Sequence, residues 1–127
     1  MPKILVVDDL RDSADSLALL FDALGHQTMT SYDGEQAIAA AQAFMPDIVF
    51  LDINMPILDG YGAARSLRSL LLATPPVLVA LTAVSGPDAQ RRADDAGFDL
   101  YVSKPADFNV LITIVDDLSK RMGNRPH

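Results

Sequence analysis

Short apolar runs rich in valine, isoleucine and leucine recur along the chain, and each is bounded by Asp, Asn, Pro or Thr. Three of them are strong and cover residues 4–7, 48–51 and 77–81, while residues 27–31 and 100–103 are weaker but have strand-like composition. Continuous apolar runs of this length are typical of strands buried on both faces of a parallel sheet. The pattern therefore predicts five strands.

Five segments with helical spacing alternate with these strands, and they cover residues 13–24, 35–44, 60–72, 88–96 and 107–121. In the first segment, four apolar side chains fall on one helical stripe and are predicted to face the core: Leu17, Leu20, Phe21 and Leu24. The second segment is dominated by alanine, the residue that favours helix most strongly. The spacing thus predicts one helix after each strand.

This alternation of strands and helices predicts an α/β fold. Right-handed crossovers turn it into a (βα)5 doubly wound, five-stranded parallel sheet with helices on both faces, the flavodoxin-like arrangement. A chain of 127 residues with 50% hydrophobic residues supplies one compact core. We expect a single domain over residues 1–122, followed by a short polar tail over residues 123–127.

The composition argues against some classes of binding partner. No apolar run approaches the roughly 20 residues that cross a bilayer, so we expect no membrane partner. The formal net charge of −7 argues against a nucleic-acid surface, because such surfaces need clustered Lys and Arg. The chain has no cysteine, which excludes disulfides and thiolate chemistry and fits a cytoplasmic protein.

Polar side chains that can bind ligands or take part in a reaction follow four of the predicted strands. Asp8 and Asp9 follow the first, Asp52 the third, Thr82 the fourth and Lys104 the fifth. Carboxylates gathered at one sheet edge repel one another, and each close pair costs up to about 4 kcal/mol at an effective dielectric near 20. A hard divalent cation offsets this repulsion, and a few carboxylates with a main-chain carbonyl suit Mg²⁺. We therefore predict a magnesium site at the carboxyl edge of the sheet.

A carboxylate beside such a cation can act as a nucleophile toward phosphorus. The charge that develops on the phosphoryl group needs donors on the side away from the metal, and Thr82 and Lys104 supply a hydroxyl and an ammonium. Asp52 is on the predicted central strand, between these donors and the acid pair. Asp52 is therefore the predicted phosphoryl acceptor.

Four motifs occur in one order and spacing that together resemble a known family. They are Leu-Val-Val-Asp-Asp at residues 5–9, Asp-Ile-Asn-Met-Pro at 52–56 with Asp-Gly at 59–60, Leu-Thr-Ala at 81–83, and Tyr-Val-Ser-Lys-Pro at 101–105. Over nearly its whole length the chain resembles the response-regulator receiver domains of two-component signalling, such as the chemotaxis regulators. The resemblance implies a bacterial phosphorelay switch that carries an aspartyl phosphate and is not a turnover enzyme.

The resemblance also implies how the acids divide their roles. Asp52 takes the phosphoryl group from a histidine kinase or a histidine phosphotransfer protein. Asp9, Asp52 and the main-chain carbonyl of Asn54 ligate Mg²⁺, for which Mn²⁺ can substitute, while Asp8 acts mostly through bound water.

The remaining motif residues are implied to contact the phosphate or to transmit its presence. Lys104 and the main-chain N–H of Ala83 contact the phosphate, Thr82 moves toward it, and Tyr101 rotates inward behind Thr82. The peptide bond before Pro105 is expected to be cis.

These movements are implied to reshape one face of the domain, which controls an unknown downstream protein or output domain. That face consists of the helix at 88–96, the strand at 100–103 and the helix at 107–121. In the last helix, Val110 and Ile114 lie off the predicted core stripe, so this face is also a candidate surface for a dimer.

Two positions that flank the site in such domains are expected to control the lifetime of the phosphorylated state. They are Asn54, two residues after the acceptor, and Val84, two residues after Thr82. Because the side chain of Val84 cannot hold a hydrolytic water by hydrogen bonding, we expect a comparatively long-lived phosphorylated state.

Two other functions compete with this interpretation. A phosphatase or phosphotransferase of the haloacid-dehalogenase type also uses a strand-end aspartate with magnesium, but it places a second acid two residues later, where this chain has Asn54. A flavodoxin-like module that binds a nucleotide or flavin needs a glycine-rich phosphate loop, and none follows Val7. A stand-alone regulator and a receiver within a larger protein both fit the sequence.

Overall fold

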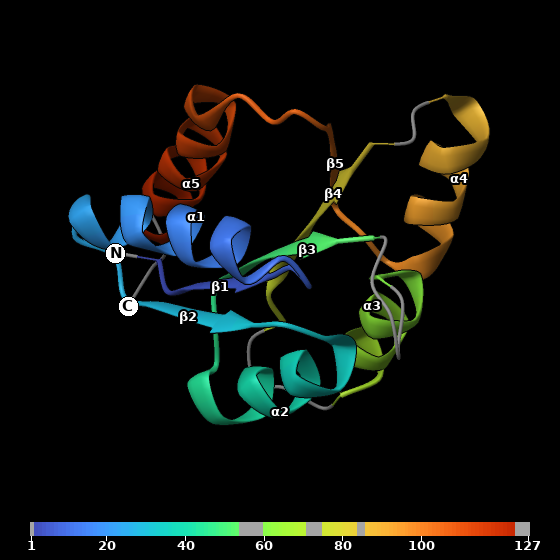
Figure 1. Cartoon of the computed structure of the whole chain (residues 1–127), viewed down its shortest axis with the longest axis horizontal. Coiled ribbons are helices and arrows are strands. Elements are labelled where there is room, and N and C mark those ends of the chain that lie inside the picture. The colour runs from blue at the N-terminus through green and yellow to red at the C-terminus, as the bar shows by residue number, and fades with distance from the viewer. Residues whose placement is uncertain (1, 54–59, 71–74, 84–85, 124–127) are drawn as a thin grey trace.

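The computed structural model describes residues 2–53, 60–70, 75–83 and 86–123, and strands and helices alternate along them (Figure 1). The strands are β1 (Ile4–Val7), β2 (Thr28–Ser31), β3 (Ile48–Asp52), β4 (Val77–Thr82) and β5 (Leu100–Ser103). The helices are α1 (Arg11–Ala23), α2 (Gly34–Phe44), α3 (Gly60–Ser69), α4 (Pro87–Ala96) and α5 (Phe108–Gly123). The predicted α/β fold is confirmed, and each element occurs where the sequence predicts it, with ends that differ by at most three residues.

All five strands are parallel and form one sheet in the order β2-β1-β3-β4-β5. The strand β3 lies in the middle, with Leu51 opposite Val7 of β1 and Asp52 opposite Leu81 of β4. Helices α1 and α5 cover one face of the sheet, and α2, α3 and α4 cover the other (Figure 1). Because every strand runs in the same direction, the residues that follow the strands meet at one edge.

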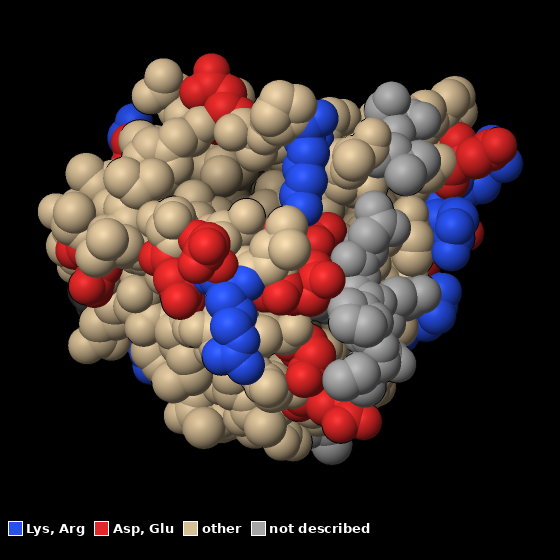
Figure 2. All heavy atoms as spheres, viewed as in Figure 1, with Lys and Arg blue, Asp and Glu red and all other residues tan. Residues whose placement is uncertain are grey.

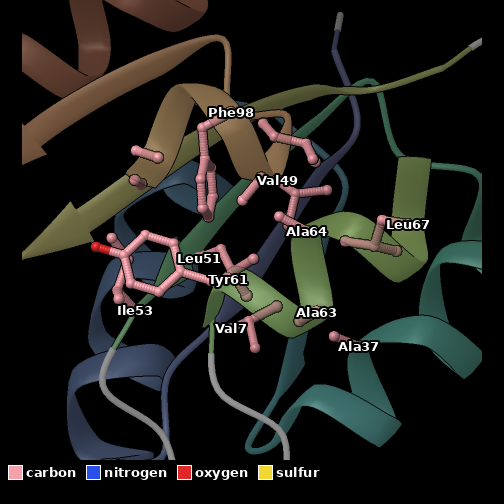
Figure 3. Close-up of a cluster of buried hydrophobic side chains, with 14 of the residues drawn as sticks. Val7, Ala37, Val49, Leu51, Ile53, Tyr61, Ala63, Ala64, Leu67 and Phe98 are labelled. Atoms are coloured by element: carbon pink, nitrogen blue, oxygen red, sulfur yellow. The ribbon is translucent and has the colours of Figure 1, made fainter. Parts of the chain in front are cut away.

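The face beneath α2, α3 and α4 is closed by aromatic and aliphatic side chains (Figure 3). Leu5, Val49 and Leu51 project from the strands and are fully buried. Tyr61 of α3 meets Phe98 edge to face, with ring centroids 6.5 Å apart. Burying a side chain of this size stabilises the fold by about 1.5–3 kcal/mol relative to exposure.

The opposite face is buried beneath α1 and α5. Ile48 and Phe50 are fully buried there, together with Phe21 of α1 and Val115 of α5. The rings of Phe21 and Phe50 stack with centroids 5.5 Å apart. Burial on both faces explains why the strands have continuous apolar runs in the sequence. No helix in the described ranges is both long and apolar enough to span a lipid bilayer.

The predicted core stripe of α1 is wrong for two of its four residues. Phe21 is fully buried, but Leu20 and Leu24 are 46% and 50% exposed. Instead, the small side chains of Ala14 and Ala18 face the sheet beside Phe21. The helix therefore rests on alanines, which lets it approach the sheet closely, and its leucines lie along the flank.

At the amino edge of the sheet, Arg68 of α3 joins three segments. Its Nε donates to the carbonyl oxygen of Gly97 at 2.8 Å, and its Nη1 donates to that of Pro76 at 2.9 Å. Its Nη2 pairs with Asp99, whose carboxylate also accepts the N–H of Leu78 at 2.8 Å. These bonds fix the starts of β4 and β5 and the end of α4 at the edge opposite the acids.

Gly60 holds the start of α3 against the end of β3. Its N–H donates to the carbonyl oxygen of Ile53 at 2.8 Å. A Cβ at this position would lie 2.4 Å from Cα of Ile53 and 2.6 Å from the carbonyl oxygen of Asp52. Only glycine allows this approach without moving the backbone that carries Asp52.

We predict that Gly60→Ala lowers the free energy of unfolding by about 2–3 kcal/mol, because overpacking against backbone atoms forces a shift of β3. The measurement is urea denaturation followed by circular dichroism. Arg65→Ala is the control, since Arg65 is exposed on the same helix and a surface substitution of this kind changes stability by no more than about 0.5 kcal/mol. Equal losses in the two variants would contradict the steric argument.

Candidate functional site

The carboxylates of Asp8, Asp9 and Asp52 meet at the carboxyl edge of the sheet, and each offers an oxygen within 4.8 Å of the others. Asp8 and Asp52 are buried, and Asp9 is the most accessible of the three. Figure 2 shows acidic side chains gathered near the middle of this face, with basic side chains on either side. The structure therefore brings the three predicted acids together.

Lys104 bridges the two buried acids. Its Nζ lies 3.3 Å from Oδ1 of Asp52 and 3.8 Å from Oδ2 of Asp8. The main-chain N–H of Lys104 donates to the carbonyl oxygen of Thr82 at 2.7 Å, and the peptide bond to Pro105 is cis. The loop after β5 thus presents one ammonium group to a pair of carboxylates from β1 and β3.

One cation between two buried acids leaves an excess of negative charge, and the ionisation of Asp8 reflects it. The pKa of Asp8 is raised from 3.8 to about 6, mainly by burial and in smaller part by the neighbouring carboxylate of Asp52. The N–H of Leu10, 3.0 Å from Oδ1, and the ammonium of Lys104 oppose this rise. Asp8 therefore holds a proton at mildly acidic pH.

The donor set fits a hard divalent cation. Three carboxylates from two loops can supply oxygen ligands on one side of a Mg²⁺ ion, while the accessible side leaves room for the waters that Mg²⁺ retains. The main-chain carbonyl of Asn54, the further predicted ligand, lies outside the described residues. Mn²⁺ also accepts carboxylate and carbonyl oxygens, so the same donors suit it.

Thr82 and Tyr101 lie on the β4 and β5 side of the acids. Thr82 ends β4 and is buried, and it is opposite Ser103 of β5. Tyr101 is half-buried and packs against the cluster beneath α2, α3 and α4. The adjacent Ala83 follows Thr82 at the same edge, whereas Val84, like Asn54, is outside the described residues.

Sequence reasoning missed a groove that leads from the acids along α1. It has a volume of about 620 Å³ and lies between α1 and the segment from Lys104 to the start of α5. Its walls are mostly apolar and include Leu17, Leu20, Phe108 and Leu111. Helical spacing predicts these leucines as core residues, because spacing alone does not distinguish a core stripe from an apolar flank.

Comparison with known proteins bears on this arrangement. A sequence model of the response regulator receiver domain matches residues 4–116. The chain belongs to this family. Receiver domains are phosphoryl-accepting signalling switches of bacterial two-component systems and not turnover enzymes. As a class they bind Mg²⁺ at an acidic pocket and interact with histidine kinases or phosphotransfer proteins and with output domains.

Similar curated proteins contain a receiver domain within a longer chain. The transcriptional regulatory protein PrrA of Mycobacterium tuberculosis is 36% identical over 123 residues, which are 97% of this chain and 52% of PrrA. The sensor histidine kinase RcsC of Salmonella typhimurium is 37% identical over 108 residues, which are 85% of this chain and 11% of RcsC. This receiver domain therefore spans about half or less of the length of these relatives.

Solved receiver domains have the same fold. The receiver domain of the Francisella response regulator 1452 superposes with a TM-score of 0.86 at 30% identity, and the match covers 96% of this chain and 99% of that one. The receiver domain of a histidine kinase from Syntrophus aciditrophicus gives 0.85 at 28% identity, covering 99% and 96%. Receivers of both kinds of parent protein thus share this architecture.

The raised pKa of Asp8 predicts a pH dependence of stability in a chelating buffer. Between pH 3.8 and about 6 the folded protein keeps a proton that the unfolded chain releases, so stability falls as pH rises through this window. The loss reaches at most about 3 kcal/mol and is complete above the folded pKa.

The measurement is the free energy of unfolding from pH 4 to 7, compared between the wild type and Asp8→Asn. The variant has no charge to bury at this position, so its curve should be flatter and lie above the wild-type curve near pH 7. Parallel curves for the two proteins would show that Asp8 is not the titrating group.

Proposed function

We propose that Asp52 accepts a phosphoryl group from a phosphohistidine donor, with Mg²⁺ held by Asp8, Asp9, Asp52 and the main-chain carbonyl of Asn54. The observation that carries this proposal is the placement of the Asp52 carboxylate. It is buried at the end of the central strand, 3.3 Å from the ammonium of Lys104 and beside the other two acids. We further propose that residues 1–122 are sufficient for this reaction.

In the proposed transfer, an oxygen of Asp52 forms the new bond to phosphorus while the phosphorus–nitrogen bond of the donor imidazole breaks. The bound dication would neutralise the acids and the phosphoryl oxygens. Lys104 keeps its contact with Asp52 and also pairs with a phosphoryl oxygen, and the N–H of Ala83 and the hydroxyl of Thr82 donate to the others. Charge that develops during transfer is therefore met first by the ammonium of Lys104, which already contacts Asp52.

Phosphorylation is proposed to act on the face formed by α4, β5 and α5. Thr82 moves toward the phosphate, and Tyr101 of the neighbouring strand rotates into the space behind it. On this face Leu100 and Val110 are 42% and 45% exposed, so they offer apolar contacts to a downstream protein, an output domain or a second copy. Ile114 packs against the core cluster, which makes it a weaker candidate for such contact than the sequence predicted.

The lifetime of the phosphorylated state is proposed to depend on Asn54 and Val84. Asn54 comes two residues after the acceptor and Val84 two residues after Thr82, and the aliphatic Val84 offers no hydrogen bond to an attacking water. Slow hydrolysis would keep the switch in its active form long enough to reach its target.

The groove beside α1 is proposed as the docking surface for the donor. Its apolar walls reach Asp8 and Lys104, so a helix lying in it would bring a phosphohistidine to the acids. Ser13 and Ser16 line the same groove, and their small side chains allow close approach of a partner helix. Leu20 supplies an exposed apolar contact within the groove.

The first test of the proposed function is labelling with acetyl phosphate and Mg²⁺, followed by intact-mass measurement. We expect one phosphoryl group per chain in the wild type and none in Asp52→Asn. Omission of Mg²⁺ should abolish labelling, because the acids alone repel the donor. Continuous release of phosphate at a high turnover rate would instead indicate an enzyme, and label on Asp52→Asn would exclude this acceptor.

The second test separates docking from chemistry. Leu20→Asp should slow phosphotransfer from a phosphorylated histidine phosphotransfer protein by about tenfold or more, since a charge would replace an apolar side chain that the docked partner buries. Labelling by acetyl phosphate should not change. Leu19→Asp is the matched control, because Leu19 is 68% exposed and does not line the groove. Equal slowing by both variants would argue against docking in this groove.

A further inference from the structure

The ring of Tyr32 lies at the same sheet edge as the acids, on the side of β2. Ser31 ends β2 opposite Val7 of β1, and the N–H of Asp8 donates to the carbonyl oxygen of Ser31 at 3.1 Å. Tyr32 is the next residue along the chain. The end of β2 therefore places this aromatic side chain beside the loop that carries Asp8 and Asp9.

Tyr32 is held in place by several contacts. Its hydroxyl donates to Oδ1 of Asp15 at 2.6 Å and accepts from the hydroxyl of Thr30 at 3.3 Å. Its main-chain N–H donates to Oε1 of Gln36 at 3.1 Å, and its ring packs against the cluster beneath α1 and α5. The ring thus forms a fixed platform at the rim of the site.

The guanidinium of Arg11 lies over this platform, with Cζ 4.2 Å from the ring centroid. Arg11 begins α1 and follows a turn in which the N–H of Leu10 donates to Asp8. Within the described parts of the chain, no carboxylate oxygen lies within 4.0 Å of its guanidinium. Arg11 therefore presents a positioned cation that makes no direct ion pair with the described residues.

Two cations therefore flank the acids at the carboxyl edge of the sheet, one from the side of β2 and one from the side of β5. Lys104 comes from the loop after β5 and contacts Asp52 directly, whereas Arg11 comes from the β2 side and rests on Tyr32. A bound divalent cation and the ammonium of Lys104 would together nearly balance the negative charge of the three carboxylates. Arg11 then adds a positive charge at the rim of the site that an approaching anion meets.

We propose that Arg11 is a donor-specificity residue, which favours phosphodonors in proportion to their net negative charge. This inference rests on the proposed phosphorylation of Asp52. In the reaction with acetyl phosphate, an oxygen of Asp52 bonds to phosphorus, the bond between phosphorus and the acetyl oxygen breaks, and acetate leaves. Arg11 attracts the phosphoryl oxygens of the donor before this reaction. It transfers no proton and forms no covalent bond during the reaction.

The experiment measures labelling rates of Arg11→Ala with two donors, acetyl phosphate and the less negatively charged phosphoramidate. We expect Arg11→Ala to react about three- to tenfold more slowly with acetyl phosphate, since one charge near an exposed site changes association by that order. The loss should be smaller with phosphoramidate. It should also shrink as salt rises from about 0.02 M to about 0.5 M, because the screening length then falls to a few ångströms.

Two further variants and one binding measurement complete the design. Arg11→Lys keeps the charge and should recover most of the rate with acetyl phosphate. Lys120→Ala removes the same charge from an exposed position near the far end of α5 and should react like the wild type. Mg²⁺ affinity, measured by calorimetry, should not weaken in Arg11→Ala, because removing a nearby positive charge lowers the repulsion of the metal ion.

Unchanged labelling of Arg11→Ala by acetyl phosphate would overturn the inference while leaving the proposed function intact. An equal loss with both donors that salt does not alter would also overturn it, since that pattern indicates a structural role. If the wild type itself takes no label from either donor, the proposed function fails and this inference fails with it. The wild-type reaction therefore distinguishes the two failures.

Discussion

The repulsion among carboxylates at one edge of the sheet is the constraint on which the rest of the structure depends. Asp8 and Asp52 are buried there, and Lys104 supplies one ammonium group between them. Burial, with the charge of Asp52 in addition, raises the pKa of Asp8, so the pocket is costly to ionise fully. This excess of negative charge favours the binding of a cation.

The fold prevents the acids from moving apart. Asp52 ends the central strand, whose five residues are all buried; four of them pair with β1 and all five pair with β4. Gly60 presses α3 against the backbone of Asp52 and Ile53, so the end of β3 has little room to shift. The sheet thus keeps the mutually repelling carboxylates close together, and burial of both its faces offsets the free-energy cost of this repulsion.

The two sides of the pocket differ in chemistry. Toward β5, Lys104 contacts the acids and adjoins an apolar groove, which suits the approach of a protein partner. Toward β2, Arg11 lies on Tyr32 without an ion pair within the described residues, which suits attraction of an anion. The apolar groove lies between α1 and the start of α5, whereas the cation lies where the first turn of α1 meets the residue that follows β2.

The sequence by itself determined the alternation of elements, the parallel sheet and the meeting of the acids with Lys104, because parallel strands bring whatever follows them to one edge. Only the tertiary structure decided which flank of α1 is exposed at Leu20 and which ring supports Arg11. Spacing along a helix records its own periodicity but not the position of neighbours that come from distant parts of the chain. The contact of Arg11 with Tyr32 depends on the pairing of β1 with β2, which no local pattern encodes.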